Sequence, residues 1–224
     1  MKISIIIPVL NESNRILKLL EMLAEIEGDK EIIFADGGSE DDTLELIPSN
    51  CITVNSSRGR GQQMNKGAEH AAGDVLLFLH CDSILGKDAV RSIQTVIESG
   101  FSGGCFTMKF DKRQWLLSII AYLSNLRVNL LGIIFGDQGM FIRKEIFQSL
   151  GGFPDIPIME DIEFSNKLRK SGRIKQLKNI IVTAARRFEK KGTLRTILFM
   201  HKMKILYWMG RSPEELYPRY KNVR

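Results

Sequence analysis

The stretch Ala35-Asp-Gly-Gly-Ser-Glu-Asp-Asp-Thr43 contains the features that decide the fold. It follows the apolar run Glu31-Ile-Ile-Phe34, which we interpret as a buried strand. Asp36 stands where that strand would end, and Gly37 and Gly38 allow a tight turn close to a ligand. In open α/β sheets, ligands bind outside the carboxyl ends of the strands. The stretch therefore indicates either a nucleotide site or an ordinary connection from strand to helix.

Alternating strand and helix patterns extend from this stretch in both directions. Short apolar runs predict strands at 3–9, 31–35, 52–54, 75–79, 103–110, 136–141 (strand or turn) and 174–182. Helical patterns are found at 13–26, 43–47, 62–72, 88–98, 115–135, 144–150, 160–171 and 192–210. We expect 103–110 to be an edge strand. The alternation predicts an α/β fold with a mostly parallel, Rossmann-like sheet flanked by helices and joined by right-handed crossovers.

The bulk composition is that of an ordinary globular protein. The chain has 224 residues, of which 44% are hydrophobic and 26% are charged, and this suits one α/β domain. We predict a main domain at 1–185 and a basic, amphipathic helical extension at 186–224 that packs on it. Three scattered cysteines form neither a zinc pattern nor an even disulfide framework. They favour a reducing, cytoplasmic location.

No segment has the character of a membrane span or a signal peptide. The first apolar run is short and is followed by Pro8, Asn11 and Glu12. The longest apolar segment, 115–135, contains Arg127 near its middle, which a spanning helix would tolerate poorly. We interpret it as part of a buried helix pair or as a lid.

Positive charge is concentrated at the C-terminus. Residues 1–185 carry 21 Lys and Arg against 23 Asp and Glu, whereas residues 186–224 carry 11 against 3. A basic segment can contact anionic lipid, nucleic acid or substrate phosphate, or can simply be a solvated helix face. For 192–211 we favour a helix packed on the sheet with a basic outer face. The alternative is an interfacial helix at the inner face of the membrane.

A second acid follows the apolar run 75–79, in the segment Leu79-His-Cys-Asp-Ser83. Asp82 would lie near the crevice that Asp36 borders, and carboxylates hold hard divalent cations that bridge to substrate phosphates. Asp82 is therefore our candidate ligand for Mn²⁺ or Mg²⁺. His80 lies two residues away, on the same face of an extended chain, and is a weaker candidate. Helix capping by Asp82 and a hydrogen-bonded histidine at the edge of the core are the alternatives.

A third acidic pair, Glu160-Asp161, opens the predicted helix 160–171. Carboxylates stabilise helix N-termini, so capping is one interpretation. The functional interpretation makes Asp161 a general base that accepts the proton of an attacking hydroxyl, with Glu160 beside it in the catalytic site.

Two glycine-containing segments provide further candidates. Asp137 and Gln138 stand between glycines and would contact a sugar or an acceptor, unless the segment is a plain turn. Arg58 and Arg60 lie in a Gly-containing loop, and arginine suits a diphosphate by charge and bidentate geometry. The chain contains neither a Walker loop nor a GxGxxG fingerprint.

Five motifs together resemble glycosyltransferase family 2, whose members have the GT-A fold. They span about three quarters of the chain and are Ile5-Ile-Ile-Pro-Val-Leu-Asn-Glu12, Ile33-Phe-Ala-Asp-Gly-Gly-Ser-Glu-Asp-Asp-Thr43, Asn65-Lys-Gly67 with Ala72-Gly-Asp74, Leu79-His-Cys-Asp82, and Glu160-Asp161. The chain looks like a short bacterial subgroup with the Leu-His-Cys-Asp form.

The resemblance implies inverting transfer of a sugar from a nucleoside diphosphate sugar, a UDP-sugar being favoured, to a hydroxyl acceptor. It assigns Asp82 to Mn²⁺ or Mg²⁺ on the diphosphate, with His201 as a further candidate metal ligand, and Asp161 to the role of base. The residues that it assigns to the nucleotide are Pro8, Asn11, Glu12, Asp36, Gly38 and Arg60.

The chain departs from the family pattern in three ways. His80 stands where the metal motif usually has an acid, and Met64 where an arginine usually precedes Asn-x-Gly. The Gln-x-x-Arg-Trp motif of processive members is absent, which favours single transfers. The alternatives to this function are a nucleotidyltransferase and a non-catalytic module that binds nucleotide sugars or lipid. We expect no nucleic-acid partner.

Overall fold

The computed structural model describes residues 1–221, with the backbone alone at Arg187, Lys190, Lys191 and Lys221. Within this range, eight strands form one sheet in the order β3-β2-β1-β4-β7-β6-β8-β5. The strands are β1 (Ile3–Val9), β2 (Lys30–Asp36), β3 (Ile52–Asn55), β4 (Val75–Phe78), β5 (Ser83–Leu85), β6 (Gly103–Phe110), β7 (Phe141–Arg143) and β8 (Ile174–Thr183).

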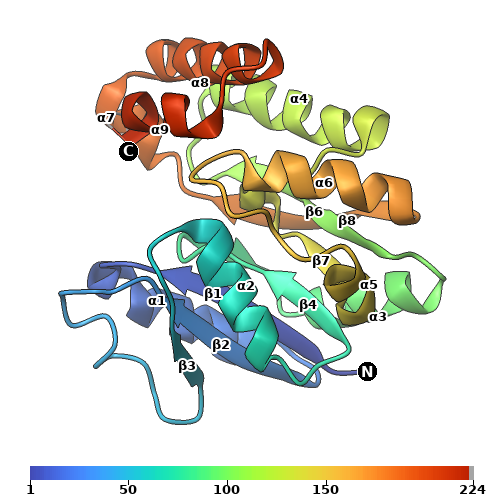
Figure 1. The fold of residues 1–224 in the computed structure, drawn as a ribbon. Coiled ribbons are helices and arrows are strands. Elements are labelled where there is room, and N and C mark those ends of the chain that lie inside the picture. Colours follow the sequence, from blue (N-terminus) through green and yellow to red (C-terminus); the bar gives the residue numbers. More distant parts are fainter. Residues whose placement is uncertain (222–224) are drawn as a thin grey trace.

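Helices cover both faces of this sheet (Figure 1). They are α1 (Ser13–Glu25), α2 (Arg60–His70), α3 (Ala89–Glu98), α4 (Trp115–Leu131), α5 (Lys144–Ser149), α6 (Glu160–Ser171), α7 (Arg186–Lys191), α8 (Thr193–Trp208) and α9 (Pro213–Lys221), with the short 3₁₀ helix η1 (Gly136–Gln138). The predicted α/β class is confirmed.

The first half of the sheet is parallel, as its apolar runs predict. β1 pairs in parallel with β2 on one side and β4 on the other. Its successive side chains enter the two cores alternately: Ile5 and Ile7 belong to one, and Ile6 to the other. The register places Val9 opposite Asp36, so the loops after β1 and β2 leave the same edge of the sheet.

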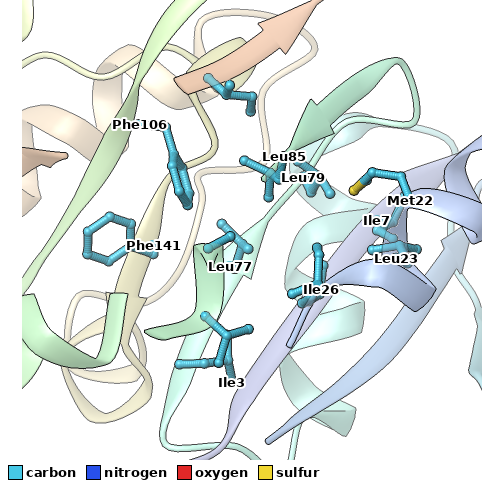
Figure 2. Close-up of a cluster of buried hydrophobic side chains, with 14 of the residues drawn as sticks. Ile3, Ile7, Met22, Leu23, Ile26, Leu77, Leu79, Leu85, Phe106 and Phe141 are labelled. Carbon is cyan, nitrogen blue, oxygen red and sulfur yellow. The ribbon is translucent and has the colours of Figure 1, made fainter. Parts of the chain in front are cut away.

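Helix α1 and strands from both halves of the sheet enclose the first core. Figure 2 shows Met22 and Leu23 of α1, and Ile26 directly after it, near Ile7 of β1 and Leu79, the residue that follows β4. The same cluster continues to Phe106 and Phe141 of the second half. One core therefore joins the two halves of the sheet.

The second half of the sheet is mixed, and one sequence prediction there is wrong. β6 lies inside the sheet, antiparallel to β7 and parallel to β8, and is not an edge strand. Gly104 makes this close packing possible, because a Cβ at this residue would lie 1.9 Å from the carbonyl oxygen of Lys175. The alternating pattern of 103–110 does not reveal that β6 has a neighbouring strand on each side, β7 and β8.

Some predicted elements differ from the structure. Residues 43–47 form turns and not a helix. The carboxylate of Asp41 turns back and accepts a hydrogen bond from the backbone N–H of Ser13 at the start of α1. The sequence does not predict strand β5, and it places α7 and α9 within the helical extension 186–224 without giving them bounds of their own. Helix α4 ends at Leu131, earlier than expected, because Gly132 adopts the left-handed conformation.

The C-terminal helices pack against the main body at the end farthest from β3 (Figure 1). Met203 of α8 and Leu216 of α9 are buried in one small cluster with Ile158, which precedes α6. The hydroxyl of Tyr207 donates a 2.5 Å hydrogen bond to Glu163 of α6. In residues 1–221, no helix is both long and apolar enough to cross a membrane.

Candidate active site

The turn after β2 is built around the Asp36 carboxylate. This side chain is 3% exposed and accepts hydrogen bonds from the backbone N–H of Gly38 at 2.9 Å and of Ser39 at 3.0 Å. The hydroxyl of Ser39 donates a further bond at 2.5 Å. Gly38 has a φ of +88°, a conformation that L-residues rarely adopt. The carboxylate therefore fixes the turn, and its contact with a nucleotide stays a prediction.

The loop after β1 is hydrogen-bonded to this turn and forms one wall with it. The backbone N–H of Asn11 donates to the Ser39 hydroxyl at 3.0 Å, and the Asn11 side chain accepts from the N–H of Glu40 at 2.8 Å. The N–H of Glu12 donates to Thr43 at 2.8 Å. Pro8 lies opposite Ala35 in the β1–β2 register. The structure thus brings together Pro8, Asn11, Glu12, Asp36 and Gly38, as the sequence predicts.

Gln63 of α2 is a component of this wall that sequence reasoning missed. Its amide nitrogen donates to the carbonyl of Val9 at 2.7 Å and to that of Ala35 at 2.8 Å. The side chain is buried and holds the ends of β1 and β2 together. The sequence signal for this role was an amide side chain on the predicted helix 62–72, next to Met64 and four residues before Gly67.

Asn65 and Gly67 of the Asn-Lys-Gly motif have structural roles. The side chain of Asn65 donates to the carbonyl of Phe153 at 2.8 Å and accepts from its N–H at 2.9 Å. It thereby fixes the loop that leads to α6. Gly67 packs on Ile6, where an added Cβ would lie only 2.4 Å from a methyl group. Met64 is buried in the core. It therefore packs as an apolar side chain at the position where the resemblance leads us to expect an arginine.

The segment after β4 lines a cavity of about 200 Å³. Cys81 and Asp82 lie on it together with Arg15 of α1 and Thr183 of β8. Burial raises the pKa of the Cys81 thiol to about 12, and the charges of Glu12 and Asp82 act in the same direction. The free thiol therefore stays protonated near neutral pH.

The donor set around Asp82 suits a cation that is shared with substrate. Among residues 1–221, no three His, Cys, Asp or Glu side chains gather into a metal cluster. A Mg²⁺-type ion commonly binds through one or two carboxylates, with waters and substrate phosphates completing its shell. Asp82 fits that arrangement as a single carboxylate at the sheet edge. The metal roles of Asp82 and His80 stay predictions.

Gly136 connects the segment after β4 to the acid at the start of α6. Its backbone N–H donates to the Asp161 carboxylate at 2.9 Å. A Cβ added at Gly136 would lie 2.9 Å from Nε2 of His80. Asp161, Gly136 and His80 are therefore close neighbours, although they come from distant parts of the sequence.

Arg60 lies against the acidic pair of α6. Its Nε donates to Glu160 at 2.5 Å, and its guanidinium is 3.8 Å from Asp161. Burial raises the pKa of Glu160, which is 1% exposed, and the positive charge of Arg60 opposes this increase. The two carboxylates raise the pKa of Arg60 despite its burial. The sequence predicts that Arg60 binds a diphosphate and that Glu160 belongs to the catalytic site. The ion pair between them neither supports nor excludes these roles, which stay predictions.

The acid and the amide of η1, Asp137 and Gln138, lie near Arg127 of α4. Gln138 is fully buried, and its carbonyl oxygen accepts from Arg127 at 2.6 Å. Burial raises the pKa of Asp137. Within residues 1–221, neither Oδ1 of Asp137 nor Nε2 of Gln138 has a hydrogen-bond partner. Their predicted contacts with sugar or acceptor remain predictions.

Helix α8 contributes a second cation near Arg127. The Arg127 guanidinium lies 3.3 Å from the centre of the Phe135 ring, and the Lys204 ammonium of α8 lies 5.1 Å from the same ring centre. Burial lowers the pKa of Lys204, and the charge of Arg127 adds to that effect. His201, in contrast, is exposed, and its ring bonds to the carbonyl of Ile197 in its own helix.

Gly136→Ala should destabilise the fold by about 1–3 kcal/mol, because the new methyl group overlaps the His80 ring. A thermal melt measures this change. Gly86→Ala is the matched control, since its Cβ would meet only the carboxylate of Asp88, at 3.1 Å. Adding His80→Ala to the Gly136 variant removes the overlap and should restore part of the loss. A Gly136 variant that melts like the original chain contradicts the contact.

Comparisons with known proteins agree with this geometry. The model of glycosyl transferase family 2 matches residues 4–151, more than half of the chain. The chain is 35% identical over 99 residues to the uncharacterized glycosyltransferase YfnE of Bacillus subtilis. That alignment covers 40% of this chain and 25% of YfnE, so the chain spans only part of its relative.

Two solved structures share the fold. Residues 1–349 of Staphylococcus aureus TarS, in complex with UDP-GlcNAc, match with a TM-score of 0.67 at 20% identity, over 82% of this chain and 58% of that fragment. The mannosyltransferase PcManGT of Pyrobaculum calidifontis, in complex with GDP-Man and Mn²⁺, matches with a TM-score of 0.66 at 20% identity, over 96% of this chain and 67% of that one. The GT-A fold expected from the sequence is confirmed, and the chain belongs to glycosyl transferase family 2.

Proposed function

We propose that the chain transfers a sugar from a nucleoside diphosphate sugar to a hydroxyl acceptor, with inversion and with the help of a divalent cation. The observation that carries this proposal is the contact of Gly136 with both Asp161 and His80. It brings the predicted base to the segment that contains the predicted metal ligand, Asp82. A transferase needs these two functions at one crevice.

The wall formed by the loops after β1 and β2 is the proposed donor site. Pro8, Asn11, Glu12, Asp36 and Gly38 would contact the base and ribose of the donor. We favour a UDP-sugar because TarS, which shares the fold, is seen with UDP-GlcNAc. PcManGT is seen with GDP-Man, so the fold accepts more than one base.

Asp82 is the residue proposed to hold Mn²⁺ or Mg²⁺, with His80 beside it. The bound cation would supply positive charge to the departing diphosphate. Arg60 would contribute its guanidinium to the diphosphate, from a position that its ion pair with Glu160 holds in place. The cation and this guanidinium would counter the charge that builds up as the bond to the diphosphate breaks.

Asp161 would act as the base in a single displacement. The acceptor oxygen forms the new bond to the sugar while the bond from the sugar to the diphosphate breaks on the opposite face, which inverts the configuration. The hydroxyl proton moves to the Asp161 carboxylate. The hydrogen bond from Gly136 fixes this carboxylate in one orientation, which contributes proximity. Asp137 and Gln138 would form the adjacent sugar and acceptor surface.

The proposal also covers the location and the remaining partners. All three cysteines are free, which supports the proposed cytoplasmic location. The acceptor is a hydroxyl compound, and a small molecule, a lipid and a glycan all fit this description. A peripheral membrane contact through 192–211 remains the alternative to a helix that only packs on the sheet.

Donor binding can be tested by thermal shift. A nucleotide sugar at about 100 times its dissociation constant should stabilise the chain by about 2.7 kcal/mol. We expect this shift with a uridine donor and Mn²⁺, and its loss on omission of the metal or in Asp82→Ala. The control is Asp29→Ala, which removes an exposed carboxylate outside the crevice. A metal-dependent shift that persists in Asp82→Ala would remove Asp82 from the metal site.

A further inference from the structure

Helix α4 exposes an apolar stripe that the fold does not cover. Of its 17 residues, only Leu117, Ala121 and Val128 are buried. The exposed apolar residues are Trp115, Ile119, Tyr122, Leu123, Leu126, Leu130 and Leu131. Most of them recur at spacings of three or four residues, so they share one side of the helix. Trp115 is 72% exposed and Leu130 is 71% exposed. The predicted buried helix pair is therefore wrong for this side of α4.

Helix α8 exposes a second stripe of the same kind. The exposed apolar residues on it are Leu194, Leu198, Ile205 and Trp208, again three, four or seven residues apart, with Met209 directly after the helix. Leu198 is 62% exposed and Trp208 is 64% exposed. Met203, on the opposite side of α8, is buried against Ile158. The stripe therefore points away from the main body.

The two helices lie side by side. Leu117 and Ile120 of α4 belong to the same packed cluster as Ile197 and Met200 of α8. Figure 1 shows both helices in the outermost layer of the molecule. We call their combined exposed surface the α4–α8 face. An exposed apolar surface of this extent marks an interaction site.

The charges on α4 and α8 indicate a negatively charged partner. Neither α4 nor α8 contains Asp or Glu. Arg195 and Lys202 are exposed beside Leu198, which places two positive charges along the apolar stripe of α8. We propose that the α4–α8 face docks on an anionic lipid bilayer. Apolar side chains would enter the acyl boundary while the cations contact lipid headgroups.

The aromatic residues support a bilayer over a second copy of the chain. Trp115, Tyr122 and Trp208 are all exposed on this face, and Trp and Tyr favour the membrane–water interface. A symmetric contact between two copies would place Arg195 and Lys202 of both copies in one interface, where α4 and α8 offer no Asp or Glu to neutralise them. An anionic surface instead neutralises them.

Tryptophan fluorescence provides a direct test, because Trp115 and Trp208 are the two tryptophans of the chain. Vesicles that contain phosphatidylglycerol should shift the emission to the blue and protect it from acrylamide. Vesicles of phosphatidylcholine alone should give a much smaller effect. The variants Trp115→Phe and Trp208→Phe each leave one reporter, and both should respond. A response from Trp208 alone would overturn the two-helix face.

Co-sedimentation with the same vesicles separates the apolar and electrostatic contributions. Replacing both Leu130 and Leu198 with Ser should weaken binding about ten-fold or more. Arg195→Glu with Lys202→Glu should do the same, with a stronger effect at low salt. The controls are Leu17→Ser, an apolar residue on α1 that is 57% exposed, and Lys178→Glu on β8. Because every substituted residue is exposed, we expect thermal melts like that of the original chain.

Three outcomes would overturn the proposal. One is no binding to anionic vesicles, and another is binding that all these variants leave unchanged. The third is a stable dimer in vesicle-free buffer that the Leu130 and Leu198 substitutions dissociate, since a second copy would then occupy the face. None of these readouts needs a nucleotide or an acceptor, so the docking face and the proposed transfer can fail separately.

Discussion

Asp161→Asn should lower the rate of sugar transfer by about 10²- to 10⁴-fold while leaving donor binding unchanged. The substitution keeps the size of the side chain and an oxygen that can accept the hydrogen bond from Gly136. It removes the group that takes the proton of the attacking hydroxyl. The loss should therefore appear in the chemical step, and the thermal shift with donor and metal should match that of the original chain.

The matched control for this experiment is Asp155→Asn, an exposed carboxylate in the loop that precedes α6. It should transfer sugar at the original rate. Full transfer activity in Asp161→Asn would exclude Asp161 as the base. A combined loss of donor binding and transfer would instead assign Asp161 to the donor or metal site.

Arg60→Ala should destabilise the chain by about 3–5 kcal/mol, because it leaves the buried Glu160 carboxylate without its positive partner. Denaturant unfolding at neutral pH measures this change. Removing one member of an exposed pair provides the comparison: Lys66→Ala, which breaks the contact with Glu69, should cost about 0–1 kcal/mol.

The pH dependence of the same variant has a defined sign. Burial raises the pKa of Glu160 above its usual value near 4.5, and Arg60 opposes the increase. Without Arg60 the pKa rises further, so the folded chain takes up a proton that the unfolded chain releases. Stability should then fall as the pH rises from 4.5 through this higher pKa, and recover on acidification. Adding Glu160→Gln to Arg60→Ala should restore much of the loss and abolish this dependence. An unchanged loss would show that the ion pair is not its cause.

The donor side of the fold could be predicted from the sequence because its signals are local. β1, β2 and β4 are continuous apolar runs, each followed within a few residues by polar groups or glycine. Parallel strands bring these ends to one edge of the sheet. Asp36 therefore lies at that edge, as predicted, with the loop of Asn11 beside it.

The rest could not be predicted because it depends on contacts between distant residues. Arg60 and Glu160 are 100 residues apart in the chain, and no local pattern pairs them. β7 has only three residues, yet it lies between β4 and β6 and makes the sheet mixed. Gln63 and Asn65 look like ordinary polar helix residues until the carbonyl groups that they bind are known. α4 has the composition of a buried helix, and only its packing shows that one side is exposed.

The strand order also has a consequence for how the chain reaches this structure. β1, β2, β3 and β4 are neighbours both in sequence and in the sheet, so this half can assemble as the chain leaves the ribosome. β5 must wait, because its partner is β8: Ser83 pairs with Thr183. Closing such a long loop costs entropy before the contact is gained, which makes it a slow step. We therefore expect the side of the site that bears Asp36 to form early in folding, and the side that bears Asp161 to be completed later.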